Sequence, residues 1–295
     1  MIVIDYNQTF ISNYMAETRG RPDVEMNLDL LRHMILNQIR NYRKRFGNEY
    51  GEVVIACDNR HYWRRDVYPF YKASRKKSRD SSGHDWSSIF DALHQIRSEL
   101  DEFLPYPVLD IDGAEADDVI GALAEYSQEN DMTDHPMFAE AEPFLILSGD
   151  HDFQQLQKYS NVQQFSPIKK KWVKLDGTPQ EVLMEHIISG DKGDGVPNIL
   201  SDDDTFVTEG KRQKPIRKAL LAEWKKQKPE EFVSGEMASG YVRNRQLVDL
   251  SMTPQEIKDE IVSEYQRQKG KSRANLLNYF IKYRLRNMME VAEDF

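Results

Sequence analysis

YPVLDIDGAEADDVIGALAEY, residues Tyr106 to Tyr126, joins a short apolar run, a cluster of acids and a helix-like pattern. Five carboxylates fall within the nine residues from Asp110 to Asp118, and each ionised acid raises the cost of ionising the next. The same order of an apolar run followed by an acid recurs in MIVID, EVVIACD and PFLILSGD, which end at Asp5, Asp58 and Asp150. Strands made of near-continuous apolar runs, alternating with helices, predict an α/β fold. Its central sheet is expected to be mainly parallel, with helices on both faces.

Helical spacing predicts helices over residues 27–46, with Asn27 as the cap, over 86–103, and from Glu115 onward. VQQFS and KWVKL are typical of short further strands, and the chain beyond about Thr178 is helical and polar. We therefore predict an α/β core over 1–178, which includes a basic segment at about 61–86. A helical region over 179–295 follows it.

The composition indicates a globular protein, because 295 residues with 39% hydrophobic content can bury a sizeable core. The longest apolar runs are far shorter than the roughly 20 residues of a membrane helix. Met1 leads directly into a strand-like run, so we expect a soluble, unexported chain. Cys57 is the single cysteine and cannot form an intramolecular disulfide, which favours a reducing cytoplasm. The histidines show no metal-ligand spacing with one another, so we do not expect a zinc site.

The net charge of −9 argues against a polyanionic partner, but the distribution of charge reverses this inference. Residues 61–79 contain one acid, Asp66, and seven basic residues: Arg64, Arg65, Lys72, Arg75, Lys76, Lys77 and Arg79. A second basic block spans 210–228. Aromatic residues interleave with the first block, which suits phosphate contacts and stacking on unpaired bases. The alternative is a solvated basic helix whose aromatic side chains lie in the core.

The acids at the strand ends are expected to converge, because the carboxyl ends of parallel strands share one edge of the sheet. Taken singly, each acid could be a turn residue, a helix cap or a partner of a helix dipole. Repetition at four strand ends is not explained in that way. No basic residue is adjacent to the clusters in sequence, so divalent cations are the economical source of opposite charge. All-carboxylate sites suit Mg²⁺ or Mn²⁺, and two ions about 3.5 to 4 Å apart would hydrolyse a phosphodiester.

Six blocks in order resemble the signature of the flap endonuclease and 5′ to 3′ exonuclease family. They are IDYNQTF, ACDN, YKASR, EADD, SGDHDF and SGDKGDGVPNI. HYWRRD and FSPIKKKWVK look most like the branch of T-even-type bacteriophage ribonucleases H. The resemblance covers nearly the whole chain. It implies a PIN-like nuclease core and a Mg²⁺-dependent, structure-selective 5′ nuclease that removes RNA primers from RNA–DNA hybrids and trims 5′ flaps during phage lagging-strand synthesis.

The resemblance also implies roles for individual residues. Around the first metal it places Asp5, Asp58, Glu115, Asp117 and Asp118, and at the second Asp150, Asp152, Asp191 and Asp194. Lys72 and Arg75 match the basic pair that touches the scissile phosphate, and Tyr71 matches an aromatic near the terminal base. The segment from about His61 to Trp86, called the arch segment below, would guide a single-stranded 5′ end. Arg64, Arg65, Lys76, Lys77 and Arg79 would contact nucleic acid.

One departure from the family pattern lies after GDKGDGVP, where this chain reads NILSDDDTFVTEGKRQKPIRKAL. Cellular members have a second glycine turn and a lysine-bearing helix there, often with bound K⁺, so a K⁺ site is expected near 190–197. Duplex contacts are expected from Lys211, Arg212, Lys214, Arg217 and Lys218. The expected partners are RNA–DNA hybrid, 5′-flap and duplex DNA, with a phage single-strand-binding protein and sliding clamp at the C-terminal helices.

We further expect a monomer in the cytoplasm of an infected bacterium. Two alternatives remain: a DNA-binding subunit that keeps the fold without cutting, and a single-strand ribonuclease of the toxin type.

Overall fold

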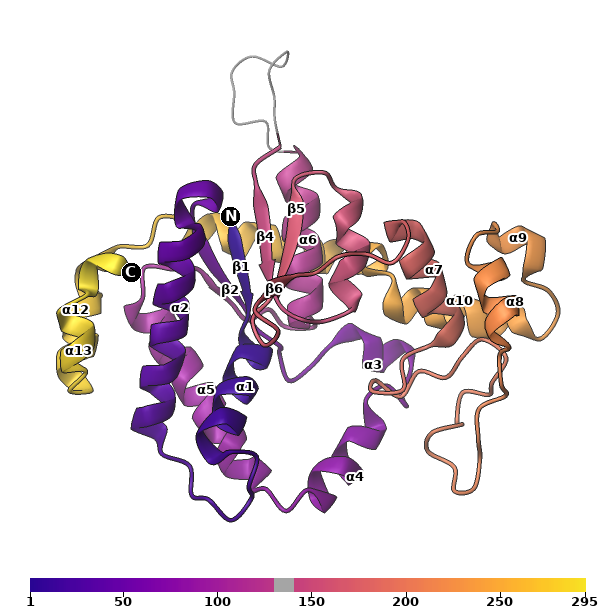
Figure 1. Cartoon of the computed structure of the whole chain (residues 1–295), viewed down its shortest axis with the longest axis horizontal. Helices are drawn as coiled ribbons and strands as arrows, with labels where there is room; N and C mark the ends of the chain where they lie inside the picture. Colours follow the sequence, from indigo (N-terminus) through magenta and orange to yellow (C-terminus); the bar gives the residue numbers. More distant parts are fainter. Residues whose placement is uncertain (130–140) are drawn as a thin grey trace.

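A computed structural model describes residues 1–129 and 141–295. Its six-stranded sheet has the order β3-β2-β1-β4-β5-β6. The strands are β1 (Ile2–Asp5), β2 (Val53–Ala56), β3 (Val108–Leu109), β4 (Phe144–Leu147), β5 (Val162–Ser166) and β6 (Lys171–Trp172). Every neighbouring pair is parallel except β5 with β6. The predicted mainly parallel sheet is therefore confirmed (Figure 1).

The helices connect the strands and then form most of the chain after residue 178. They are α1 (Tyr6–Thr18), α2 (Leu28–Tyr50), α3 (Trp63–Val67), α4 (Ala73–Ser81), α5 (Trp86–Phe103), α6 (Ala116–Glu129), α7 (Pro179–Ser189), α8 (Lys218–Trp224), α9 (Pro229–Phe232), α10 (Met237–Val248), α11 (Gln255–Gln268), α12 (Leu276–Lys282) and α13 (Arg286–Met289). Short 3₁₀ helices cover Asp152–Lys158, Leu250–Met252, Arg273–Asn275 and Ala292–Asp294. The helix predicted at 86–103 has those bounds, and Asn27 caps α2 by accepting from Leu30 N–H at 3.0 Å.

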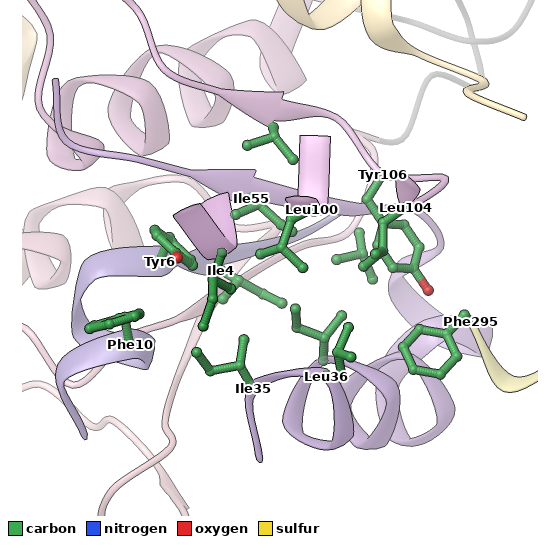
Figure 2. Packing of buried hydrophobic residues seen from close by; sticks show 14 of the residues in the cluster. Ile4, Tyr6, Phe10, Ile35, Leu36, Ile55, Leu100, Leu104, Tyr106 and Phe295 are labelled. Atoms are coloured by element: carbon green, nitrogen blue, oxygen red, sulfur yellow. The ribbon is translucent and has the colours of Figure 1, made fainter. Parts of the chain in front are cut away.

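Side chains alternate along each strand and separate two hydrophobic cores. Ile4 and Ile55 face α1, α2 and α5, and Figure 2 shows them beside Ile35 and Leu100. Val3 and its neighbours on the opposite face pack against α6 and α11. Helices therefore cover both faces of the sheet, as predicted.

Helix α1 was not predicted from the sequence. It begins immediately after β1, and Asp5 caps it by accepting a hydrogen bond from Gln8 N–H at 2.9 Å. Its buried residues Tyr6, Phe10 and Tyr14 recur every four positions, so the signal was present but short. The helix brings Asn7 and Gln8 beside the carboxyl ends of the strands.

The region after residue 178 contributes to more than one core. Helices α7, α8 and α10 pack around a cluster that includes Ile188, Ile199 and Tyr241. Helix α11 instead completes one face of the sheet, and α12 packs on the other. The boundary at 178 remains a prediction, and this packing makes α11 and α12 part of the hydrophobic cores on the two faces of the sheet. Within 1–129 and 141–295, no helix is both long and apolar enough to cross a lipid bilayer.

Candidate active site

A cavity of about 950 Å³ lies at the carboxyl ends of the parallel strands. Helices α1 and α5 form one side, and the arch segment with α4 forms the other (Figure 1). The predicted metal-binding acids that line it are Asp5, Asp58, Glu115, Asp117, Asp150, Asp152, Asp191 and Asp194. The strand ends thus bring together acids that are up to 189 positions apart in the chain, from Asp5 to Asp194.

The first two strand-end acids are held by their neighbours. Asp5 Oδ2 accepts a hydrogen bond from Ser148 Oγ at 3.1 Å, which links the ends of β1 and β4. Asp58 Oδ1 accepts from Ala116 N–H at 2.8 Å, and its Oδ2 accepts from Asn7 Nδ2 at 2.7 Å. These contacts orient both carboxylates before any ligand binds, which is the preorganisation that a metal site requires.

Several of the clustered carboxyl groups of the cavity have raised pKa values. Burial and the nearby Asp58 raise the pKa of Asp5 to about 7. Burial and Asp152 raise the pKa of Asp150 to about 6, and burial with Asp150 raises the pKa of Asp117 well above its usual value. Ionising these groups together is costly unless cations balance them. Clustered carboxylate oxygens fit hard divalent ions, so the donor set agrees with the predicted metal site.

Asp191 and Asp194 reach the cavity from a tight turn after α7. Asp194 N–H donates to Asp191 Oδ1 at 2.9 Å, and Val196 N–H donates to the Asp191 carbonyl at 2.7 Å. Gly190 has a φ of +68°, and a Cβ there would lie 2.4 Å from the Val196 carbonyl oxygen. Only glycine fits this position, and the turn it permits places both acids at the cavity.

The arch segment brings basic side chains to the acids, although no lysine or arginine is adjacent to the strand-end acids in sequence. Lys72 Nζ donates to Glu115 Oε1 and lies 3.5 Å from Asp194 Oδ2, while Arg75 pairs with Asp194. Tyr71 OH donates to Asp194 Oδ2 at 2.8 Å and lies 3.1 Å from Glu115 Oε2. Although burial alone would lower it, Glu115 raises the pKa of Lys72 above its usual value. Lys72 is therefore a buried, charged lysine within the acid cluster.

Two predicted site residues have a different role. Arg64 is 1% exposed, and its Nη1 donates to Glu115 Oε2 at 3.0 Å and to Asp118 Oδ2 at 2.7 Å. Asp118 Oδ1 accepts from Trp63 Nε1 and Thr253 Oγ1, so both of its oxygens are occupied inside the protein. The prediction that Arg64 contacts nucleic acid is wrong, because its guanidinium is buried. Asp118 does not line the cavity, and its oxygens are not free for a metal.

We expect Arg64→Met to destabilise the fold by about 3 to 5 kcal/mol, because it removes the buried guanidinium that pairs with both Glu115 and Asp118. Urea unfolding in EDTA measures this loss. Arg65→Met is the matched control, since Arg65 is adjacent, exposed and on the cavity lining. Equal stability of the two variants would contradict the structural role of Arg64.

The remaining predicted basic residues lie on the surface. Arg65 and Arg79 line the cavity, and Lys76 and Lys77 are exposed on α4. In the second basic block Lys211, Arg212, Lys214, Arg217 and Lys218 are exposed. Lys211 Nζ lies 2.9 Å from Asp202 Oδ2 and also pairs with Asp204, so part of its charge is neutralised locally.

His186, in the last turn of α7, was missed by the sequence analysis. Its Nδ1 lies 3.0 Å from Asp152 Oδ1, and its Nε2 lies 3.3 Å from Asp191 Oδ2. Although burial opposes the charged form, Asp152 and Asp191 raise the pKa of His186 to about 10. His186 lies five positions before Asp191 on a helix that the sequence did not place beside the strand ends, so no spacing rule marked it.

Comparison with known proteins shows the family of this chain. Residues 1–186 match the family described as 5′-3′ exonuclease, N-terminal resolvase-like domain. The chain belongs to the 5′-3′ exonuclease family. Residues 177–295 of this family member match the family described as T4 RNase H, C terminal.

Curated relatives carry corresponding names. The chain is 34% identical to the ribonuclease H of Enterobacteria phage T4 over an alignment of 303 residues. The alignment covers 99% of this chain and 95% of that protein. It is 26% identical over 212 residues to the 5′-3′ exonuclease of Buchnera aphidicola subsp. Acyrthosiphon pisum, which covers 68% of this chain and 65% of that protein. This family member is a structure-specific 5′ nuclease, and therefore a phosphodiesterase.

Solved structures share the fold. The bacteriophage T5 flap endonuclease in a pseudo-enzyme–product complex with DNA and metal ions superposes with a TM-score of 0.62 at 15% identity, covering 90% of this chain and 98% of that chain. The T5 5′-exonuclease with bound zinc gives a TM-score of 0.61 at 16% identity, with the same coverage. At these identities the likeness shows the shared fold.

The raised pKa values predict how metal binding depends on pH. Without metal, the folded chain binds protons at Asp5 and Asp150 more tightly than the unfolded chain, so this contribution to stability falls as pH rises from about 4 through 7. Divalent ions bind the deprotonated acids, so their stabilisation grows over the same window. We expect Mg²⁺ to raise the melting temperature more at pH 8 than at pH 5.5, measured against EDTA. Asp5→Asn should weaken this difference, and an equal Mg²⁺ effect at both pH values would contradict it.

Proposed function

We propose that this nuclease hydrolyses phosphodiester bonds with two Mg²⁺ ions, for which Mn²⁺ substitutes, at the carboxylate-lined cavity. The observation that carries the proposal is that the cavity is lined by the clustered acids and also by Lys72 and Arg75 from the arch segment. Such a cavity can hold divalent cations at the acids and a phosphate beside the two basic residues. The similar T5 structure with DNA and metal ions supports this arrangement.

The acids divide into two groups. Asp5, Asp58, Glu115 and Asp117 would hold the first ion, and Asp150, Asp152, Asp191 and Asp194 the second. The two ions would supply an activated water and neutralise the leaving oxygen of an in-line displacement. This division is a proposal that follows the resemblance and the positions of the strand ends.

Lys72 and Arg75 would act on the substrate from the arch segment. Their present partners, Glu115 and Asp194, are themselves proposed metal ligands. With those acids engaged as ligands, Lys72 and Arg75 would be free to pair with the scissile phosphate. The charged side chains of Lys72 and Arg75 would stabilise the negative charge that develops on the phosphate in the transition state. Tyr71 is 3% exposed, does not line the cavity and donates to Asp194, so its burial contradicts the predicted contact with the terminal base.

The proposed substrates are RNA–DNA hybrids and 5′-flapped duplexes, from which the enzyme removes RNA primers and adjacent DNA during phage lagging-strand replication. The full-length similarity to a protein named ribonuclease H supports this choice. Arg65, Lys76, Lys77 and Arg79 would guide the single-stranded 5′ end past the cavity. We also propose a K⁺ ion near 190–197. The proposed protein partners are a single-strand-binding protein and a sliding clamp. The protein would act as a monomer in the cytoplasm of an infected bacterium.

Salt dependence tests the duplex contacts. Each phosphate contact on duplex DNA contributes about −0.9 to the log–log slope of affinity against salt. We expect Arg217→Ala to make the slope shallower by about that amount. Lys211→Ala should change it much less, because Asp202 and Asp204 already neutralise Lys211. Fluorescence anisotropy between about 50 and 200 mM salt measures both slopes. A larger change for Lys211 than for Arg217 would contradict the expected duplex path.

A choice among substrates tests the proposed function against its rivals. Cleavage rates are compared on a 5′-flapped duplex, a nicked RNA–DNA hybrid, a blunt duplex and linear single-stranded RNA. The proposal expects the first two to be cut fastest, with products that map to the 5′ side of the junction. Preference for linear RNA would favour a toxin-type ribonuclease, and binding without cleavage of any substrate would favour a non-cleaving DNA-binding subunit.

A further inference from the structure

His186 is the imidazole that lies within the carboxylate cluster, and the two-metal proposal gives it no role. Its side chain is 10% exposed, and it lies between Asp152 at one ring nitrogen and Asp191 at the other. Potential ligand atoms of these three residues all fall within 4.8 Å of one another. The group therefore offers one nitrogen and two carboxylates to a cation.

The contact between His186 and Asp152 has the spacing of two ligands on one ion. In the part of the chain that the structure describes, Nδ1 and Oδ1 are 3.0 Å apart as an ion pair, but the contact lacks the directional geometry of a hydrogen bond. A cation bound beside both atoms would satisfy this buried oxygen directionally. Adjacent ligands of an octahedral ion with bonds near 2.1 Å lie about 3.0 Å apart, which is the separation seen here.

The other ring nitrogen has the partner that a metal-binding histidine needs. His186 Nε2 and Asp191 Oδ2 are in hydrogen-bond contact at 3.3 Å. Histidines that bind metal through one nitrogen usually donate the other N–H to a carboxylate, which fixes the tautomer and the ring orientation. When Nε2–H donates to Asp191, the lone pair of Nδ1 would be available to an ion bound beside Asp152.

We propose that His186 Nδ1 is a ligand of the second metal ion, beside Asp152, and that Asp191, while remaining among the acids around that ion, also orients the imidazole through Oδ2. An imidazole donor favours borderline transition ions such as Zn²⁺ over Mg²⁺, which prefers oxygen ligands. The inference deepens the proposed function and rests on it, because it assigns a ligand and a metal preference to the same second site.

Electron spin-echo envelope modulation of bound Mn²⁺ tests the ligand directly. The full chain, loaded with two equivalents of Mn²⁺, is expected to show ¹⁴N modulation from a coordinated imidazole. His186→Gln should abolish the modulation. His151→Gln is the matched control, because its ring lies 5.5 Å from that of His186 and flanks the same site, and it should leave the modulation intact. No ¹⁴N modulation in the wild-type chain, or its survival in His186→Gln, would overturn the proposal.

Metal selectivity gives a second readout. By titration calorimetry, His186→Gln should weaken Zn²⁺ binding at one site by about 10- to 100-fold, with a much smaller effect on Mg²⁺. Equal losses for both ions would overturn the nitrogen-ligand assignment. The same preparation is assayed for flap cleavage in Mg²⁺. Failure of wild-type cleavage would count against the proposed function, whereas missing ¹⁴N modulation in an active enzyme would count against His186 alone.

Discussion

Asp150→Asn is expected to lower cleavage of a 5′-flapped duplex by about 10³-fold or more, a loss of about 4 kcal/mol of transition-state stabilisation. Asp152→Asn should have the same effect. The amide keeps the shape of the side chain but removes the negative charge that would hold the second ion. DNA affinity measured in EDTA should stay the same or rise slightly, because binding resides in the basic surfaces and one repulsive carboxylate is lost. Single-turnover cleavage and fluorescence anisotropy separate the two effects.

Asp112→Asn is the control for these variants. Asp112 lies in the acid-rich stretch 110–118 at the end of another strand, but its side chain is 79% exposed and does not line the cavity. Its replacement should leave cleavage unchanged. Because burial and Asp152 raise the pKa of Asp150, Asp150→Asn should also stabilise the metal-free fold at pH 8. Full turnover in both Asp150→Asn and Asp152→Asn would rule out the two-metal assignment.

Lys72→Met is the second change with a large expected effect. It should lower single-turnover cleavage by about 10²- to 10³-fold, the usual result of removing a group that stabilises transition-state charge. Binding should weaken only modestly, because Lys72 is 9% exposed and makes little contact with the surface over which the DNA lies. Methionine keeps most of the length of the side chain but lacks the ammonium group, which lies 5.0 Å from the centroid of the Tyr71 ring.

Lys76→Met provides the comparison for Lys72. Lys76 is exposed on α4, one turn further along the arch segment, and should affect binding and its salt dependence more than the chemical step. Circular dichroism and Mg²⁺ affinity establish whether Lys72→Met retains the site, since the substitution also removes the ion-pair partner of Glu115 Oε1. Equal losses of binding and cleavage would make Lys72 a tether for the substrate and not a catalytic residue.

Repetition along the chain was enough to predict the sheet and the convergence of the acids. An apolar run followed by an acid recurs at Asp5, Asp58 and Asp150, and parallel strands bring such positions to one edge. Asp191 and Asp194 required the family resemblance, because they reach the cavity from a turn between helices that strand periodicity does not locate.

Adjacent residues with opposite roles mark the limit of the sequence prediction. Asp117 lines the cavity, whereas Asp118, one position later on α6, points into the interior and pairs with Arg64. Successive helical residues are rotated by about 100°, and only the surrounding packing decides which one faces the ligand. Arg64 and Arg65 differ for the same reason on α3. In each pair the two residues are of the same type and adjacent in sequence, so the sequence alone does not predict which one is buried.

The measurement that tests the central claim most directly follows a 3′-labelled strand of a 5′-flapped duplex, incubated with the purified chain in Mg²⁺ and in EDTA, with binding measured in parallel. The account predicts binding under both conditions and cleavage near the junction in Mg²⁺ alone. Binding without cleavage in Mg²⁺, or equal cleavage in EDTA, would contradict the claim that the strand-end carboxylates form a metal-dependent nuclease site.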